Sequence, residues 1–307
     1  MKYYYLSHYP TAFLKMTGLR VNEFEQLVKD VLPMYVEAEE ARLERPDRQR
    51  APGGGRRAEL DAQDQILLTV IWLRLYLTQD VLGYFFGVSQ PVVSNYIMHV
   101  LPVLEQAGRD TMRMPDPGRK GRRDLDQLLA DMPEVMVVID SFEQRVQRPK
   151  DRDEQKRLYS GKKKAHTLKS QVVVDADTGE IGDVSDSVPG PDADISLLDQ
   201  SEVLEDLPEG VGAMGDLAYQ GIDQRHPFAY CPRKKPRGKD RPPEDVAYNS
   251  AFSRRRIIVE NTIGRMRRYQ SITQVDRHHR KYHTARVVAA AGLANRQIRS
   301  RLLPAAA

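Results

Sequence analysis

Cysteine, long apolar runs and a signal-peptide core are scarce or missing in this chain of 307 residues. The single cysteine, Cys231, excludes a framework of internal disulfides and suits a reducing compartment. No apolar run reaches the ~18 residues that a membrane-spanning helix needs, and residues 1–10 lack the apolar segment of a secretory signal. These absences predict a soluble, cytoplasmic protein with no membrane partner.

Charge of one sign is missing over a long stretch. Residues 171–224 contain fourteen Asp or Glu and no Lys or Arg, whereas residues 225–302 contain twenty Lys or Arg and five Asp or Glu. The formal net charge of +4 conceals this segregation. A basic segment of this size favours a polyanion partner such as nucleic acid over the alternative of a merely charged surface.

The N-terminal part of the chain is expected to be helical, and the sequence contains no internal repeat. Apolar residues recur at helical spacing over 11–43, which predicts a helical region at residues 1–44. Residues 45–59 contain proline, three consecutive glycines and a surplus of arginine, and they predict a basic, Gly-rich linker. The linker could follow a DNA backbone or be only a connecting loop.

The next segment has the start and stop signals of three helices. The stretch LDAQDQILLTVIWLRLYL predicts an apolar helix with Asp61 or Asp64 as its cap. A short helix is expected after Thr78, ended by Gly87 in the left-handed conformation, and Ser89 would cap the following helix. Two helices joined by a three-residue turn that contains glycine are typical of a helix-turn-helix.

We therefore expect a helix-turn-helix DNA-binding domain at residues 60–115. Its second helix would lay Gln90, Ser94 and Asn95 in the major groove of DNA. The sequence rules of this motif are loose, so a helical hairpin inside an ordinary bundle is the alternative.

Residues 133–303 have the pattern of an α/β domain. The apolar segment 134–140 predicts a buried strand, and residues 164–188 predict a hairpin that turns at 177–179. A helix over 192–207, strands within 210–216 and 227–234, and a long basic helix follow in that order. The order predicts a mixed sheet with helices on its faces, and the fold class is α/β preceded by an all-α region.

Three carboxylates stand out in this α/β part. Two strands are expected to end on an aspartate, Asp140 and Asp216, where open α/β folds bind ligands. The basic helix holds six arginines and one acidic residue, Glu260, within Arg254–Tyr269. Three carboxylates from separate elements suit Mg²⁺, and two such ions could hold the attacking and leaving oxygens of a phosphoryl transfer. A salt bridge between Arg256 and Glu260, four residues apart on a helix, is the less favoured alternative.

Basic side chains near these carboxylates are expected to contact DNA phosphates. In the segment YSGKKKAHTLK they are Lys162, Lys163, Lys164 and His166. In the basic helix they are Arg254, Arg255, Arg256, Arg265, Arg267 and Arg268. A solvated hairpin is the alternative for the first group. Asp194 is expected either to assist the metal site or to cap its helix.

Taken in order, these segments resemble the DDE transposases. The resemblance rests on LTQDVLGYFFGVSQPVVSNYI, VVIDSFEQRVQRP, YSGKKKAHTLKSQVVVD, PGPDADISLLDQS, MGDLAYQGI and RRRIIVENTIGRMRRY. It is greatest to insertion-sequence transposases of the IS-five kind, relatives of the Harbinger elements, and covers residues 62–302. The resemblance implies an RNase H-like catalytic core at residues 133–303, with Asp140, Asp216 and Glu260 as its metal-binding triad.

Two positions depart from the pattern of that family. Relatives often carry the signature Tyr-x2-Arg-x3-Glu-x6-Lys, in which Arg256 and Glu260 match the arginine and the glutamate. Ser253 stands at the tyrosine position, and Arg267 replaces the lysine. Arginine can still hold a phosphate, whereas serine does not supply the phenol of the tyrosine.

The resemblance implies a DNA transposase that cleaves DNA with two Mg²⁺ or Mn²⁺ ions and transfers the freed strand. Its partners would be double-stranded DNA, as the terminal repeats of its element and as target, and further copies of itself in a homodimer or larger assembly. It would act in the cytoplasm of a bacterium, at the nucleoid when bound to DNA. The alternatives are a metal nuclease of the same fold that does not join strands, and a domesticated helix-turn-helix protein without catalysis.

Overall fold

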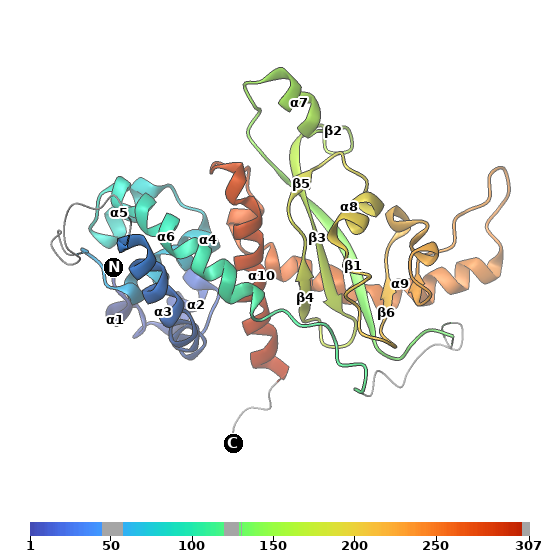
Figure 1. The fold of residues 1–307 in the computed structure, drawn as a ribbon, viewed down its shortest axis with the longest axis horizontal. Helices are drawn as coiled ribbons and strands as arrows, with labels where there is room; N and C mark the ends of the chain where they lie inside the picture. The colour runs from blue at the N-terminus through green and yellow to red at the C-terminus, as the bar shows by residue number, and fades with distance from the viewer. Residues whose placement is uncertain (45–57, 120–128, 130, 303–307) are drawn as a thin grey trace.

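The computed structural model describes residues 1–44, 58–119, 129 and 131–302. An N-terminal helical part lies beside a sheet with helices on both faces, and the C-terminal helix stands between the two (Figure 1). Most of the predicted linker, residues 45–57, lies outside the described residues. Within the described part, none of the helices combines the length and apolar character that crossing a bilayer requires.

The N-terminal region forms three helices, as its periodicity predicts. They are α1 (Tyr3–Leu6), α2 (Pro10–Thr17) and α3 (Val21–Leu43). Gly18 ends α2 in the left-handed conformation with a φ of 80°. Phe24 and Val31 of α3 are fully buried, so the apolar face of the helix packs inward.

The predicted helix-turn-helix is present. Its helices are α4 (Ala62–Leu75), α5 (Gln79–Phe86) and α6 (Gln90–Arg109). The Asp61 side chain accepts a hydrogen bond from the Asp64 backbone N–H at 2.8 Å, which caps α4. Gly87 ends α5 with a φ of 72°, as predicted. Thr78 and Ser89 occupy the N-cap positions of α5 and α6, although neither side chain makes a capping hydrogen bond.

The sheet is mixed, as predicted. Its strands are β1 (Met136–Arg145), β2 (Tyr159–Ser160), β3 (Ala165–Asp175), β4 (Ile181–Val184), β5 (Val188–Pro189), β6 (Gly212–Met214) and β7 (Ala229–Tyr230). Strands β2, β3, β1, β6 and β7 follow one another across the sheet, and β4 and β5 pair with the outer edge of β3. Strand β3 is antiparallel to β1, whereas β6 is parallel to β1 and β7 is parallel to β6.

Three elements differ in length from the prediction. Strand β1 does not end at Asp140 but continues to Arg145, because β3 supplies hydrogen-bonding partners along the whole segment. The helix predicted over 192–207 is the shorter α8 (Asp194–Ser201), and Glu202 ends it with a φ of 54°. The strand predicted within 227–234 is reduced to the two residues of β7.

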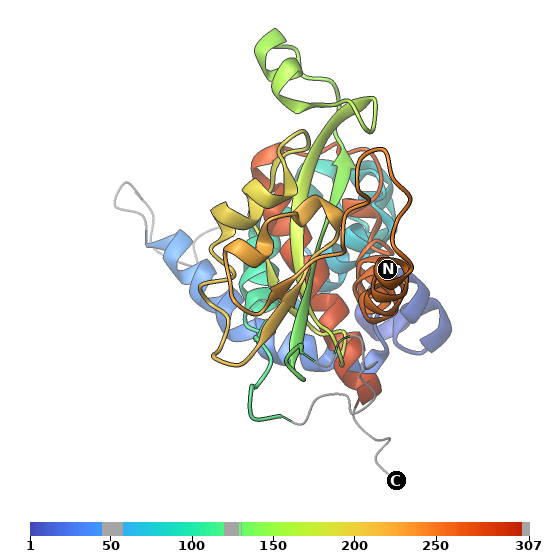
Figure 2. The same cartoon turned by 90° about the vertical axis from the view of Figure 1, so that its right-hand side faces the viewer.

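Helices cover both faces of the sheet (Figure 2). Helix α8 lies on one face, and α9 (Pro243–Met266) and α10 (His283–Leu302) lie on the other. Helix α7 (Arg152–Leu158) projects beyond the end of the sheet (Figure 2), with Leu158 against Leu168 of β3. Val138 belongs to a core cluster shared with α6, α9 and α10, whereas Val137 faces a second cluster that contains Leu198 of α8. This alternation along β1 is the period-two pattern of a strand buried on both faces.

Helix α10 joins the helical part to the sheet by packing against α6. A side chain at Gly292 would put its Cβ 2.4 Å from the Cα of Gly108. Both glycines are therefore needed for the close approach of the two helices. Apolar residues of α10 belong to the main hydrophobic core.

Candidate active site

Asp140 and Asp216 lie side by side because β1 and β6 run parallel. Val138 is opposite Met214 in the register of the two strands, so the same register extended by two residues sets Asp216 opposite Asp140. Strand β6 stops at Met214. Beyond Asp140, the edge of β1 on the β6 side therefore has no strand beside it in the described structure, while β3 continues along the other edge. The two aspartates thus occupy the end of the parallel part of the sheet, although β1 itself continues.

The Asp140 carboxyl is in a crowded electrostatic environment. Burial, and to a lesser extent the charges of Asp216 and Asp194, raise the pKa of Asp140 from 3.8 to about 6. The backbone N–H of Ser141, 2.8 Å away, and the Arg256 guanidinium, 3.6 Å away, act in the opposite direction. Burial therefore dominates the electrostatics of Asp140, and the neighbouring carboxylates add to its effect.

Tyr219 is a member of this site that the sequence did not reveal. It is fully buried, and its hydroxyl lies 3.3 Å from the Gln171 side-chain oxygen. Burial raises the pKa of Tyr219 well above its ordinary value, and Asp194, Asp140 and Asp216 add to that shift. The phenol consequently stays protonated and can donate a hydrogen bond amid the three carboxylates.

Asp194 is held at the site by two contacts. The Ser141 hydroxyl donates to its carboxylate at 2.6 Å, and the ammonium of Lys169 lies 3.0 Å away. The residue at the N-cap of α8 is Ala193, and Asp194 is the first residue of the helix. The prediction that Asp194 caps its helix is therefore wrong, because its side chain turns to Lys169 and Ser141 instead.

Glu260 lies on α9, one helical turn beyond Arg256. Arg256 forms its ion pair with Asp140, so the alternative of a salt bridge with Glu260 is not what this structure contains. The Glu260 side chain is exposed. Among the described residues, no three His, Cys, Asp or Glu side chains are close enough to hold a metal ion by themselves. The charge of Asp216 acts on Asp140, but Asp140, Asp216 and Glu260 do not form a metal-binding group of three in this structure.

A cavity of about 430 Å³ opens next to these carboxylates. Ser141 and Asp194 line it on the side of the aspartates, and Lys162, Lys163 and Arg267 line it as well. Lys164 is exposed in the turn beyond. Three of the predicted phosphate-binding cations therefore converge from two distant segments on one cavity.

The other residues predicted to contact DNA do not line the cavity beside Asp194. The His166 ring packs against Tyr159 at 5.7 Å between centroids. Arg255 is buried and donates to the backbone oxygen of Glu134 at 2.8 Å. Arg254 and Arg268 are exposed, and Arg265 is half-buried. In the helix-turn-helix, Asn95 is exposed, whereas Gln90 and Ser94 are half-buried and line a separate cavity.

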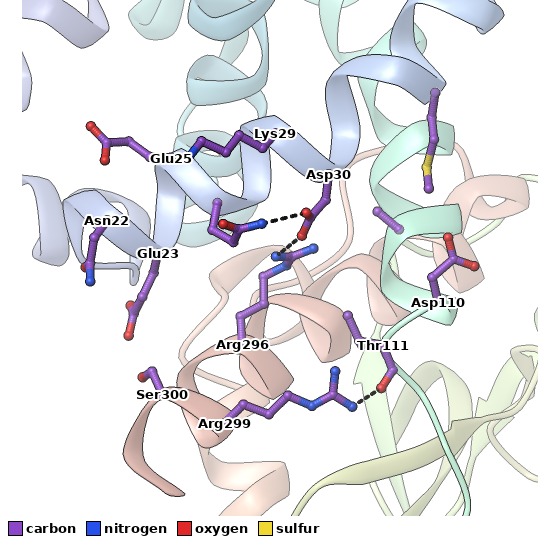
Figure 3. A pocket seen from close by; sticks show the side chains of 13 residues that line it. Asn22, Glu23, Glu25, Lys29, Asp30, Asp110, Thr111, Arg296, Arg299 and Ser300 are labelled. Atoms are coloured by element: carbon purple, nitrogen blue, oxygen red, sulfur yellow. Dashed lines mark hydrogen bonds and ion pairs between the residues drawn. The ribbon is translucent and has the colours of Figure 1, made fainter. Parts of the chain in front are cut away.

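Another cavity, of about 660 Å³, lies between α3, α6 and α10 and is remote from the aspartates (Figure 3). Its two arginines already have partners. Arg296 pairs with Asp30 at 2.7 Å, and Arg299 donates to the backbone oxygen of Thr111 and pairs with Glu180. The two arginines of this cavity are therefore neutralised within the chain.

Comparison with known proteins agrees with this arrangement. Residues 139–295 match the family described as DDE superfamily endonuclease, and residues 58–110 match the helix-turn-helix of DDE superfamily endonuclease. The chain is also 30% identical over 271 residues to the "Probable transposase for insertion sequence element IS702" of Microchaete diplosiphon, an alignment that covers 88% of each protein. The chain therefore belongs to the DDE superfamily of endonucleases, among the transposases that carry an N-terminal helix-turn-helix.

Proposed function

We propose that this transposase binds the ends of its element and cuts them with Asp140, Asp216 and Glu260 as ligands of two divalent ions, Mg²⁺ or Mn²⁺. The observation that carries the proposal is the parallel pairing of β1 and β6, which sets Asp140 beside Asp216. The cavity with Lys162, Lys163 and Arg267 next to them supports a phosphate substrate.

The donor set suits such ions. Carboxylate oxygens are the ligands that Mg²⁺ prefers, and one or two carboxylates suffice when waters and substrate phosphates complete the shell. The raised pKa of Asp140, about 6, reflects mainly its burial and, to a lesser extent, the charges of Asp216 and Asp194, and a bound cation would favour its ionised form. When bound, the ions would polarise phosphate oxygens and make a bound water more acidic.

The protein's own side chains supply binding and orientation. Lys162, Lys163 and Arg267 hold the phosphates that flank the bond to be cut, and Arg256 keeps the Asp140 carboxylate in position at 3.6 Å. The buried Tyr219 hydroxyl donates to the Gln171 side-chain oxygen at 3.3 Å, which holds the neutral phenol near the aspartates. Glu260, exposed on α9, completes the ligand set when DNA and ions are in place.

We further propose that the 3′-hydroxyl freed at one element end attacks target DNA in the same site. The helix-turn-helix would hold the terminal repeat, with Gln90, Ser94 and Asn95 toward the bases. Two ends must be brought together for this reaction, so the working form is a homodimer or a larger assembly on DNA. It acts in the bacterial cytoplasm, at the nucleoid.

The test uses a plasmid that carries the DNA flanking the gene, incubated with the protein and Mg²⁺ or Mn²⁺. Strand breaks and joined products are mapped for the parent and for Asp140→Asn, Asp216→Asn and Glu260→Gln. Breaks at discrete ends with joined products, lost in all three variants, establish the transposase. Cleavage without joining supports the metal nuclease, and binding without cleavage supports a domesticated DNA-binding protein.

A further inference from the structure

A cavity of about 790 Å³ lies between the helix-turn-helix and a segment of the catalytic part. One wall is formed by Gln90 and Ser94, on the first two turns of α6. The facing wall is formed by residues of the segment Arg277–Tyr282, which we call the basic loop. The residues expected to face DNA bases therefore share a cavity with a segment almost two hundred positions later in the chain.

The basic loop reads RHHRKY and contains no acidic residue. The Lys281 ammonium lies 4.8 Å from the centroid of the Tyr282 ring, and it has no carboxylate partner among the described residues. His279 is exposed as well. Arg280 is already paired with Glu154 at 2.7 Å. Among the described residues, the cations of this wall without a carboxylate partner are Lys281 and Arg277, and Arg277 is held by the Tyr76 ring and backbone oxygen. Lys281 is therefore the cation left for a ligand, with the exposed imidazole of His279 beside it.

His278 and its neighbours add a polar and aromatic lining. The His278 ring is stacked on Tyr282 at 5.6 Å between centroids and meets Trp72 edge-on at 5.4 Å. Its Nε2 is buried and has no hydrogen-bond partner in the described structure. A buried polar atom without a partner is unusual in a folded protein, and here it belongs to a residue that lines the cavity.

The loop is rigidly tied to both parts of the protein by Asp276, the residue before it. The fully buried Asp276 carboxylate accepts hydrogen bonds from the Tyr76 hydroxyl at 3.0 Å and from Arg286 of α10. The Asp276 backbone N–H donates to Arg145, at the end of β1, at 2.8 Å. Arg277 stacks over the Tyr76 ring at 4.5 Å. The position of the loop relative to α6 is therefore set by contacts to α4, α10 and β1.

We propose that the basic loop and the first two turns of α6 form one DNA-binding surface. In it α6 faces the bases and the loop holds the phosphate backbone beside them. This inference rests on the proposed function. The major groove is about 12 Å wide and bounded by phosphates, so a helix in the groove brings backbone to neighbouring segments of the protein. Within the described part of the chain, the lining of the cavity contains one acidic residue, Asp80, and the cations Arg277 and Lys281. We place the phosphate strand at these cations.

The chemistry favours duplex DNA as the occupant. A cation without a carboxylate partner and an exposed imidazole suit phosphate and sugar oxygens. The contact adds affinity without reading sequence, because phosphates are the same at every base pair. It also fixes the distance between the recognised base pairs and Asp140, since the loop is bonded to β1, the strand that carries Asp140.

The experiment compares Lys281→Gln and Lys281→Glu with the parent protein. The matched control is Lys29→Gln, an exposed lysine of α3 that lines a different cavity. The dissociation constant is measured for the element end and for an unrelated duplex over a range of salt concentrations. We expect Lys281→Gln to lower the slope of log Kd against log salt by about one, and to raise the Kd for both duplexes by the same factor. Lys281→Glu should raise both Kd values further, and Lys29→Gln should have the Kd values and slope of the parent.

A hydroxyl-radical footprint supplies the second readout. In Lys281→Gln we expect protection to be lost at one stretch of backbone beside the bases recognised by α6, while Gln90→Ala changes sequence preference and leaves the salt slope intact. A parent that binds and cleaves DNA while both Lys281 variants keep its slope and footprint would overturn this inference alone. A parent that binds no duplex would overturn the proposed function together with it.

Discussion

Arg256 forms its ion pair with Asp140 across 3.6 Å, and not with Glu260 one turn along the same helix. The side chains of the pair are 13% and 22% exposed, so the interaction is largely shielded from solvent. This choice of partner leaves Glu260 exposed and available, and it links α9 directly to the strand that carries the first aspartate. Glu260 therefore does not stabilise the protein through an ion pair with Arg256. If it acts as a metal ligand instead, its substitution should change DNA cleavage and not the free energy of unfolding.

Glu260→Gln is expected to abolish metal-dependent cleavage and leave folding intact. Substitutions at exposed positions without specific contacts usually change the free energy of unfolding by less than about 0.5 kcal/mol. Urea unfolding and plasmid cleavage are measured on the same preparations. The control is Glu244→Gln, at an exposed position in the first turn of α9, which should leave both quantities unchanged. Full cleavage by the Glu260 variant would remove this residue from the ligand set.

Asp140→Asn is expected to stabilise the metal-free protein at neutral pH while it abolishes cleavage. The pKa of Asp140 is about 6 in the native state and 3.8 ordinarily, so the native state binds a proton more tightly than the unfolded chain. Above pH 6 both states are ionised and the native state bears the whole penalty, which is at most about 3 kcal/mol for two pKa units.

The stabilisation by Asp140→Asn should shrink as the pH falls from 6 and vanish below about pH 4. Urea unfolding at pH 7.5, 5 and 4 without metal ions provides the check. Added Mn²⁺ should raise the unfolding midpoint of the parent and have less effect on the variant. A variant less stable than the parent at pH 7.5 would contradict an energetic penalty for the buried, ionised Asp140.

Asp194→Asn is expected to destabilise the protein because it leaves the Lys169 ammonium without its counterion. The two side chains are only 16% and 8% exposed, and breaking a buried pair typically costs about 3–5 kcal/mol. Lys169→Met combined with Asp194→Asn should recover much of that loss, because no uncompensated charge remains. Urea unfolding of the two single variants and the double variant gives the coupling energy. Additive losses would mean that the two residues act independently.

His283 is expected to make the protein less stable as the pH falls. Burial and then Arg286 lower the pKa of His283 from 6.5 to about 3, and its ring nitrogens are bonded to Gln144 at 2.8 Å and Ser187 at 2.6 Å. Below pH 6.5 the unfolded chain takes up a proton that the native state does not, so stability falls by about 1.4 kcal/mol per pH unit until about pH 3.

His283→Gln should remove one proton from that pH dependence. The unfolding free energy is measured from pH 7 to pH 5 for the parent, for His283→Gln and for His8→Gln, whose exposed ring provides the control. The slope should fall by about one proton in the first variant only. An equal slope in all three proteins would show that His283 is not held neutral in the native state.

Much of the architecture could be predicted because it depends on neighbours in the chain. The helix-turn-helix follows from apolar periodicity and from Gly87, whose left-handed φ of 72° suits a residue without a side chain. The β3–β4 hairpin follows from its turn residues. Asp140 and Asp216 could be identified because an acidic residue after a short apolar run stands out locally. For these features the physical cause lies within a few residues of each position.

Other features depend on contacts between segments far apart in the chain. Strand β1 extends beyond Asp140 because β3 pairs with it as far as Arg145, and the local sequence contains no such information. Asp194 contacts Lys169 and Ser141 rather than capping α8. His283 is buried against Gln144, 139 positions earlier in the chain.

The sequence by itself therefore determined the order of the elements, the helix-turn-helix, the three carboxylates and the membership of the DDE superfamily. Only the tertiary structure decided that Arg256 faces Asp140, that Tyr219 lies amid three aspartates, and that Gln90 shares a cavity with the basic loop. The reason is physical. Helix caps, turns and periodicity act over a few residues, whereas charge pairing and burial depend on which distant segments the folded sheet brings together.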